Sequence, residues 1–261
     1  MFDDAKRQVA VAPRVLADLG LASGAQAALG EISLRIADDS QKFAARGQGY
    51  TIDTLNRRRP EDIVVMGTDG GIVDGPLGIS ASAEWPLHAA IFSARPEVQA
   101  VVHVHGRFVG LMSLLDQPIR PLCQEGVALV RQPLPVYPEA APVSSVQAGE
   151  AVAKALGGSK CLVLHGHGLV VAGNSLGDAV VSALQLEEQA RMNWLAYCVV
   201  GPDYKYLPDI YIEEMIVRTP QFDLPHFKGL TRGGGRDGGA LGWSYFRQAA
   251  EASMAAEASP A

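Results

Sequence analysis

Short apolar runs alternate along the chain with longer segments in which apolar residues recur at helical spacing. The short runs are rich in valine, leucine and isoleucine, and they predict strands at 32–37, 62–66, 98–105, 161–165 and 169–172. The longer segments predict helices at 6–22, 82–94, 108–115, 145–156 and 175–199. The turn at 68–71 is followed by Ile72 and Val73, which predicts a hairpin. This alternation of strands and helices is typical of an α/β domain.

Turn and capping residues punctuate the pattern. Ser82 is expected to cap the helix that follows it. Prolines at 133, 135 and 138 predict a rigid loop around Tyr137. Beyond Gly201 the pattern is less regular, and residues 229–242 contain seven glycines. We therefore expect a catalytic domain over 1–228 and a partly flexible extension over 229–261, in which the last Ala/Glu/Ser-rich run is a frayed tail.

Composition narrows the class of protein. The chain has 261 residues, 48% hydrophobic and 19% charged, as expected for a compact enzyme-like domain. Its net charge of -6 argues against nucleic acid as a partner. No segment approaches the roughly 20 apolar residues of a membrane span, and the first residues lack a signal-peptide pattern. Three scattered cysteines are typical of reduced thiols, so we expect a cytoplasmic protein acting on a small molecule.

Four of the six histidines lie in two His-X-His units, each at the end of an apolar run. His103 and His105 follow the valine-rich run 98–102, and side chains two apart on a strand face the same side. His165 and His167 follow the run 161–164. Imidazole nitrogen is a good ligand for zinc, manganese and iron(II). Since one such unit alone is often structural, it is the pair of units that favours a shared metal ion.

The order of motifs resembles that of the class II aldolase/adducin-type family, over roughly residues 10–200. The matching segments are Gly30-Glu31-Ile32-Ser33-Leu34-Arg35, Ser82-Ala83-Glu84-Trp85, Ala94-Arg95-Pro96 through His103-Val104-His105, and Leu164-His165-Gly166-His167-Gly168 with Gly173 and Leu176. The resemblance implies an α/β/α layered sandwich around a mostly antiparallel sheet. It also implies one divalent metal ion per subunit and a homo-oligomer, a tetramer in most bacterial members.

Residue roles follow from the resemblance, position by position. His103, His105 and His167 correspond to the metal ligands. Glu84 corresponds to the acidic residue beside the metal, which acts as acid/base and can itself ligate the ion. His165 occupies a position where relatives often have arginine or another polar residue, so it is expected either to contact substrate or to support the site. The sequence leaves zinc, manganese, cobalt and iron open.

The sequence constrains the type of reaction less tightly than it constrains the metal ligands. Sugar-phosphate aldolases of this family hold phosphate with an early asparagine and paired serines, which here are Glu31 and Ser82-Ala83. A carboxylate at a phosphate position would repel the dianion in a poorly screened pocket. The segments 121–138 and 186–191 are most similar to the decarboxylase branch that acts on hydroxylated aromatic carboxylates, especially the dihydroxyphthalate type. We therefore favour a metal-dependent decarboxylase, a lyase, of an ortho-hydroxylated aromatic carboxylate.

Further residues are expected to contribute. Tyr137 lies where aldolases of the family place a catalytic tyrosine donated by a neighbouring subunit. Arg107, two residues beyond His105, can pair with a substrate carboxylate, whereas Glu31 and Ser82 are expected at the substrate. Two alternatives stay open. One is an aldolase acting on a sugar phosphate or another hydroxy-carbonyl compound, and the other is a non-catalytic adducin-like module.

Overall fold

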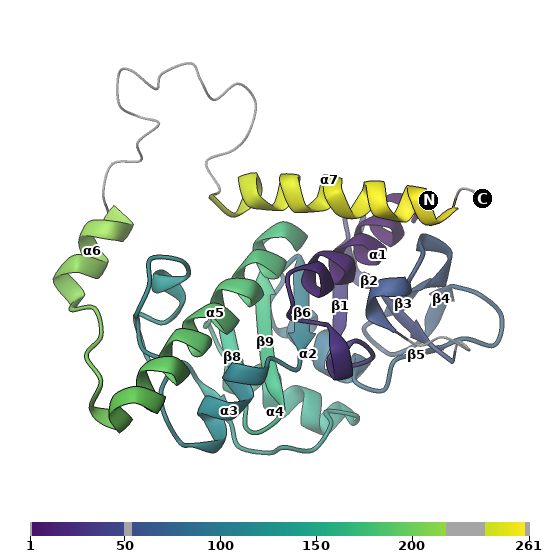
Figure 1. Ribbon diagram of the computed structural model, residues 1–261. Coiled ribbons are helices and arrows are strands. Elements are labelled where there is room, and N and C mark those ends of the chain that lie inside the picture. The colour runs from purple at the N-terminus through teal and green to yellow at the C-terminus, as the bar shows by residue number, and fades with distance from the viewer. Residues whose placement is uncertain (1, 50–53, 218–237, 259–261) are drawn as a thin grey trace.

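The structure is a computed structural model that describes residues 2–49, 54–217 and 238–258 (Figure 1). In that part of the chain one sheet has the strand order β4-β3-β2-β1-β6-β9-β8-β7, and β5 pairs with β2. All pairings are antiparallel except that of β7 with β8. The strands are β1 (Glu31–Ile36), β2 (Asp39–Gln48), β3 (Ile63–Gly67), β4 (Ile72–Asp74), β5 (Ser80–Ala81), β6 (Ala100–Val104), β7 (Val136–Tyr137), β8 (Cys161–Leu164) and β9 (Gly168–Gly173).

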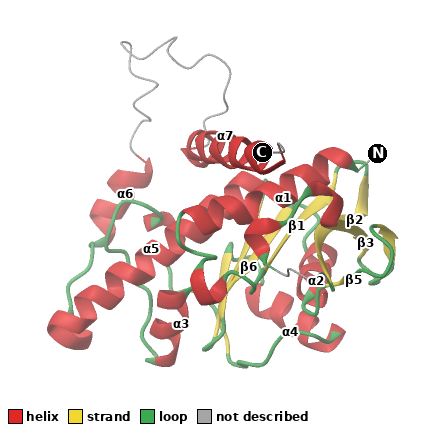
Figure 2. Cartoon of the chain, turned by 45° about the vertical axis from the view of Figure 1, so that its right-hand side comes forward, coloured by secondary structure: helices red, strands yellow, loops and turns green. Residues whose placement is uncertain are grey.

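Helices cover both faces of the sheet (Figure 2). The α-helices are α1 (Asp3–Asp18), α2 (Trp85–Ala94), α3 (Arg107–Leu114), α4 (Val146–Leu156), α5 (Leu176–Val200), α6 (Asp209–Val217) and α7 (Gly238–Ala258). Short 3₁₀ helices are η1 (Gly24–Gln26), η2 (Leu55–Arg57), η3 (Pro60–Asp62), η4 (Val127–Leu129) and η5 (Gly201–Asp203). One core lies between the sheet and α2 and α4, and another between the sheet and α1, α3, α5 and α7. The predicted α/β/α sandwich with a mostly antiparallel sheet is confirmed.

The valine-rich run that precedes the first histidine pair forms β6, a central strand buried on both faces. All its residues are buried, and their side chains alternate between the two cores. Val101 packs in the core with α2 and α4, whereas Val102 packs in the core with α1 and α5. His103 therefore points toward the α2 side of the sheet, where the neighbouring strand places Glu31 directly opposite it.

Several local predictions differ from the structure. Strand β2 was not expected, because its residues Asp39–Gln48 are mostly polar or small and lack an apolar alternation. The Pro-rich segment contains β7, a two-residue strand paired with β8, rather than only a loop. Ser82 does not cap α2, whose N-cap position is Glu84. Helix α1 ends at Asp18, four residues before the predicted end.

The C-terminal run is the largest difference. The described part of the Ala/Glu/Ser-rich run, predicted as a frayed tail, belongs to α7, which packs against α1 and α5. Ala250 is fully buried in this contact, and Glu257 pairs with Arg14 at 3.0 Å. Alanine-rich sequence has high helix propensity, and burial against two helices stabilises it further. The predicted division between 228 and 229 lies outside the described residues, as does most of the glycine-rich segment, and it stays a prediction.

Within the described ranges, no helix combines the length and the hydrophobicity needed to cross a lipid bilayer.

Candidate metal centre

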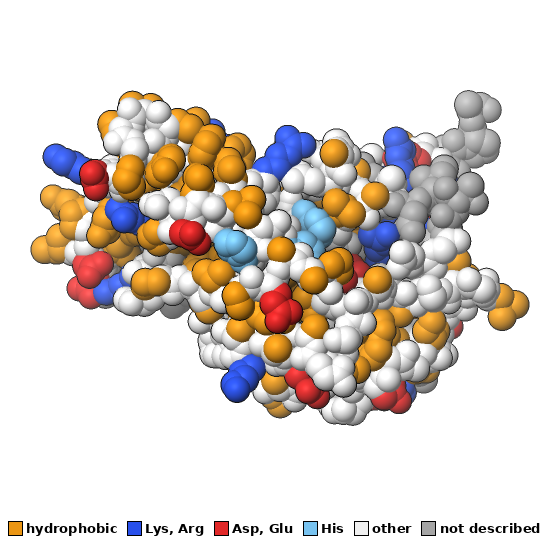
Figure 3. Space-filling model, turned by 90° about the horizontal axis from the view of Figure 1, so that it is seen from below, with side chains coloured by type: hydrophobic (Ala, Val, Ile, Leu, Met, Phe, Trp, Pro, Cys, Tyr) orange, Lys and Arg blue, Asp and Glu red, His pale blue; other side chains and the backbone are white. Residues whose placement is uncertain are grey.

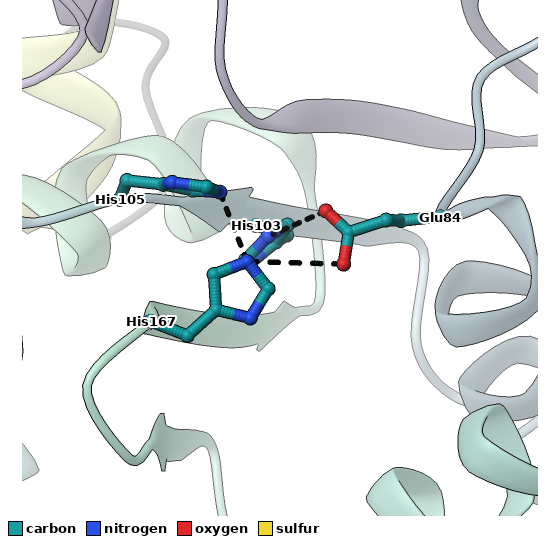
Figure 4. A group of neighbouring side chains, drawn as sticks. All are labelled: Glu84, His103, His105 and His167. Atoms are coloured by element: carbon teal, nitrogen blue, oxygen red, sulfur yellow. Dashed lines mark hydrogen bonds and ion pairs between the residues drawn. The ribbon is translucent and has the colours of Figure 1, made fainter. Parts of the chain in front are cut away.

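Glu84, His103, His105 and His167 converge on one point, although they come from three parts of the chain (Figure 4). His103 is on β6, and His105 follows the end of that strand. His167 lies in the turn between β8 and β9, and Glu84 precedes the first turn of α2. Each of the four offers one ligand atom, and these atoms all lie within 4.8 Å of one another.

Two glycines bring the second histidine unit to the first. His165, Gly166 and His167 form the turn of a tight hairpin rather than a strand end, and Gly166 has a φ of 63°. This left-handed conformation is available to glycine at little cost. Gly168 passes so close to the carbonyl of Val104 that a Cβ atom would collide with it. A side chain there would push β9 away from β6 and separate His167 from His105.

The imidazoles present their Nε2 atoms to a common point. His103 donates its Nδ1 proton to the carbonyl of Leu169 at 3.0 Å, so the lone pair of the neutral ring lies on Nε2. His103 Nε2 is buried, lacks a well-formed hydrogen bond and lies 3.2 Å from Glu84 Oε2. The Nε2 atoms of His105 and His167 are 3.1 Å apart. Ligands of one tetrahedral ion with bonds of about 2.0–2.1 Å lie roughly 3.3 Å apart, so the donor set fits a divalent metal.

Electrostatics keep two of the imidazoles neutral. Burial, reinforced by repulsion from the neighbouring His103 and His167 rings in their protonated forms, lowers the pKa of His105 to about 4. Burial also lowers the pKa of His167. For His103, burial acts in the same direction, but contact with Glu84 outweighs it and raises the pKa. Burial alone would raise the pKa of Glu84, yet His103, the Val143 N–H and His167 lower it to about 2. Glu84 is therefore ionised at neutral pH.

Buried polar groups surround Glu84 on the side away from the three histidines and fix its position. Oε1 of Glu84 accepts the Val143 N–H at 2.7 Å. The Glu31 carboxylate accepts the Glu84 N–H at 3.4 Å and the Ser82 hydroxyl, and it lies 3.5 Å from His88 Nε2. His88 Nδ1 is 2.6 Å from Ser33 Oγ. Burial raises the pKa of Glu31 above its ordinary value, against the opposing effect of Ser82. Glu31 and Ser82, predicted at the substrate, are only 5% and 4% exposed here, so their predicted contact with substrate stays a prediction.

Three other predicted residues lie outside the group of four. Arg107 is exposed at the start of α3, two residues beyond His105. Tyr137 is buried in the core beside β8, where burial and the Glu139 carboxylate raise its pKa. His165 faces a separate cavity of about 310 Å³, whose lining includes Val136 and Val163. The catalytic roles of Tyr137 and His165 stay predictions.

Two residues at the mouth of the site have roles that the sequence analysis did not predict, although one of them, Glu187, lies in the segment 186–191 compared there with the decarboxylase branch. Glu187, on α5, accepts the backbone N–H groups of Phe108 and Val109 and so caps the start of α3. Gln26, on η1, binds both the His105 carbonyl and Arg107. Both act across about 80 residues of sequence, so only the folded chain reveals them. Histidine side chains reach the surface on the face shown in Figure 3, and among the described histidines only His105, His165 and His167 are not buried.

Comparison with known proteins places this geometry in a family. The profile of the Class II Aldolase and Adducin N-terminal domain matches residues 7–194. The chain is 34% identical over 218 residues to 3,4-dihydroxyphthalate decarboxylase of Arthrobacter keyseri, covering 81% of this chain and 86% of that protein. It is 31% identical over 228 residues to the enzyme of the same name from Rhodococcus jostii, covering 80% of this chain and 90% of that protein.

The fold agrees with this assignment. The structure of L-fuculose 1-phosphate aldolase from Glaciozyma antarctica superposes with a TM-score of 0.76, over 98% of this chain and 91% of that one. Its identity to this chain is 21%, so it supports the fold alone. The sequence profile, the decarboxylase relatives and the three-layer fold all agree, and the chain belongs to the class II aldolase and adducin family.

Proposed function

We propose that this protein is a metal-dependent lyase that removes one carboxylate from an ortho-hydroxylated aromatic dicarboxylate such as 3,4-dihydroxyphthalate. The observation that carries the proposal is the convergence of Glu84, His103, His105 and His167 within 4.8 Å. Two of the relatives reported above are 3,4-dihydroxyphthalate decarboxylases, which selects this substrate class within the family. Zinc, manganese, cobalt and iron all suit such a donor set.

The three histidines would hold one divalent ion, with Glu84 as neighbour or fourth ligand. When bound, the ion supplies Lewis acidity at oxygen atoms of the substrate and so stabilises negative charge there. Bound to the ion, all three imidazoles would be in their neutral form and would leave its positive charge undiminished. The low pKa values of His105 and His167 favour the neutral form that ligates metal.

Glu84 would carry the proton. Its pKa of about 2 means that it meets the substrate as a carboxylate, that is, as a base. It takes the proton of the hydroxyl group ortho to the departing carboxylate and delivers it to the ring carbon that bears this carboxylate. The C–C bond then breaks, carbon dioxide leaves, and the bonding electrons return through the ring to the hydroxyl oxygen. A proton from solvent completes the product, 3,4-dihydroxybenzoate.

The surroundings of Glu84 disfavour a sugar phosphate. Glu31 and Ser82 occupy positions at which related aldolases hold phosphate, but the Ser82 hydroxyl donates to the Glu31 carboxylate, which also accepts the Glu84 N–H. They therefore support the proton-carrying residue and present little donor capacity to a dianion. The aldolase alternative remains the second candidate, because retro-aldol cleavage uses the same metal and the same acid/base residue.

We also propose that the protein assembles as a homo-oligomer. Large apolar side chains are exposed on α6 and on the end of α5, among them Ile210, Tyr211, Ile216 and Val199. Exposed large apolar side chains in such numbers are typical of a protein interface. A second copy would bury it, and a neighbouring subunit could then complete the site.

A side-by-side assay tests the reaction class. The purified, metal-loaded protein is supplied with 3,4-dihydroxyphthalate in one series and with fuculose and ribulose phosphates in another. We expect carbon dioxide and 3,4-dihydroxybenzoate in equal amounts from the first series and no aldehyde from the second. Efficient cleavage of the phosphates without carbon dioxide from the aromatic acid would restore the aldolase alternative.

Arg107 is expected to bind the carboxylate that remains on the ring. Arg107→Ala should raise KM for 3,4-dihydroxyphthalate by about tenfold or more and change kcat much less, because a charge-assisted hydrogen bond to a spectator group contributes mainly uniform binding. Steady-state kinetics measure both values. The matched control is Arg131→Ala, which removes a half-buried arginine paired with Glu213 and should leave KM unchanged. A fall in kcat with KM constant would instead place Arg107 at the reacting atoms.

A further inference from the structure

A single side chain connects Arg107 to the backbone of a candidate metal ligand. The Nε–H of Arg107 donates to Oε1 of Gln26 at 2.9 Å. The amide nitrogen of Gln26 donates to the carbonyl of His105 at 2.7 Å. Both the oxygen and the nitrogen of the Gln26 amide are therefore hydrogen-bonded, and Gln26 links the Arg107 side chain to the backbone of His105. No motif of the family resemblance includes Gln26.

The same contacts determine which part of the guanidinium is free. Nη2 of Arg107 lies against Gly24, where a Cβ atom would come within 3.3 Å of it. Among the described residues, neither Nη1 nor Nη2 has a hydrogen-bond partner, and the Arg107 side chain is exposed. Since Nε is occupied, the pair Nη1 and Nη2 remains to bind an anion. Two parallel N–H groups match the two oxygens of a carboxylate.

We propose that Gln26 is a positioning residue that selects aromatic dicarboxylates, because it holds Arg107 in place for the carboxylate that stays on the ring. The inference rests on the proposed function. An exposed arginine samples many rotamers, and fixing it costs conformational entropy when the ligand binds. The Gln26 hydrogen bond orders the side chain before the ligand arrives, so the binding energy of the second carboxylate is not lost to ordering Arg107.

The test compares two ligands that differ only in this carboxylate. The product 3,4-dihydroxybenzoate has two adjacent hydroxyls and the remaining carboxylate, whereas catechol has the hydroxyls alone. Calorimetry on the metal-loaded full chain gives Kd for both, with wild type, Gln26→Met, Arg107→Ala and the double variant. Methionine keeps the length of glutamine but forms neither hydrogen bond. Gln8→Met, which removes a surface hydrogen bond to Asp4 on α1, is the matched control.

Gln26→Met should weaken 3,4-dihydroxybenzoate binding about threefold to tenfold, the effect of one lost hydrogen bond, and leave catechol binding unchanged. Gln26→Met should cause no further loss of 3,4-dihydroxybenzoate affinity when Arg107 is already alanine, because Gln26 acts through that arginine. KM for 3,4-dihydroxyphthalate should rise by the same factor with kcat within about twofold of wild type.

Three results would overturn the inference: unchanged affinity for 3,4-dihydroxybenzoate, equal weakening of both ligands, or loss of bound metal from Gln26→Met. The last would mean that Gln26 acts through the His105 carbonyl instead. The proposed function fails separately, if wild type binds 3,4-dihydroxybenzoate through Arg107 but releases no carbon dioxide from 3,4-dihydroxyphthalate.

Discussion

Replacing His105 with alanine is expected to remove both the bound metal and the activity. Two imidazoles and Glu84 would remain, and a site that loses one of three neutral nitrogen ligands binds a divalent ion far more weakly. Metal analysis of the purified variant should show much less than one ion per chain. Decarboxylation should fall below detection, while circular dichroism stays native because His105 is half-buried at the end of β6.

His165→Ala is the matched control for this experiment. His165 lies two residues from His167 in the same turn, but its side chain faces the separate cavity beside Val136. The variant should keep its full complement of metal. Its residual activity then measures directly whether His165 also contributes to catalysis. A fully metallated and active His105→Ala protein would refute the proposed ligand set.

Glu84→Gln is expected to lower kcat by about 10²-fold or more, the usual contribution of a positioned proton carrier. Glutamine has nearly the same shape as glutamate, and its carbonyl oxygen can still accept the Val143 N–H. It cannot take up or release the proton that moves from the hydroxyl to the ring carbon. KM should change much less than kcat, which steady-state kinetics with the metal-loaded variant will establish.

Glu31→Gln provides the comparison for Glu84. Glu31 is the neighbouring buried carboxyl, and an amide oxygen can replace its acceptor contacts with Ser82 and the Glu84 N–H. We expect a loss of kcat of less than about tenfold, consistent with a supporting role. Near-normal turnover in Glu84→Gln would assign the proton to another group, with Tyr137 and His165 the next candidates.

The strands and helices that line the cores were predictable from sequence, because their apolar residues recur with the period of a strand or of a helix. The valine-rich run that forms β6 alternates between two cores, and the long helix α5 has capping serine Ser175 at its start. Strand β2 was not predictable in the same way. Only Phe43, Ala44 and Ala45 supply apolar side chains to the cores, and the strand is ordered by its pairing with β1 and β3. Helix α7 was missed because its stability comes from packing on α1 and α5, which the local sequence does not reveal.

The candidate site likewise contains residues that local sequence predicted and residues that it did not. His103, His105, His167 and Glu84 were identified from motif order, and the structure brings exactly those four side chains together. The second histidine unit meets the first through a glycine turn, not through the strand alternation that predicted it. Gln26 and Glu187 act on Arg107 and α3 across about 80 residues. Such contacts depend on tertiary structure, so no local pattern marks them.

The most direct test of the account is a metal titration of carbon dioxide release. The chain is stripped with a chelator and titrated with zinc, manganese, cobalt or iron(II), and carbon dioxide from 3,4-dihydroxyphthalate is measured at each step. We expect no release from the stripped protein. With at least one of these ions, release should rise to a plateau at one ion per chain. Undiminished release after stripping, or no release with any of the four ions, would contradict this expectation.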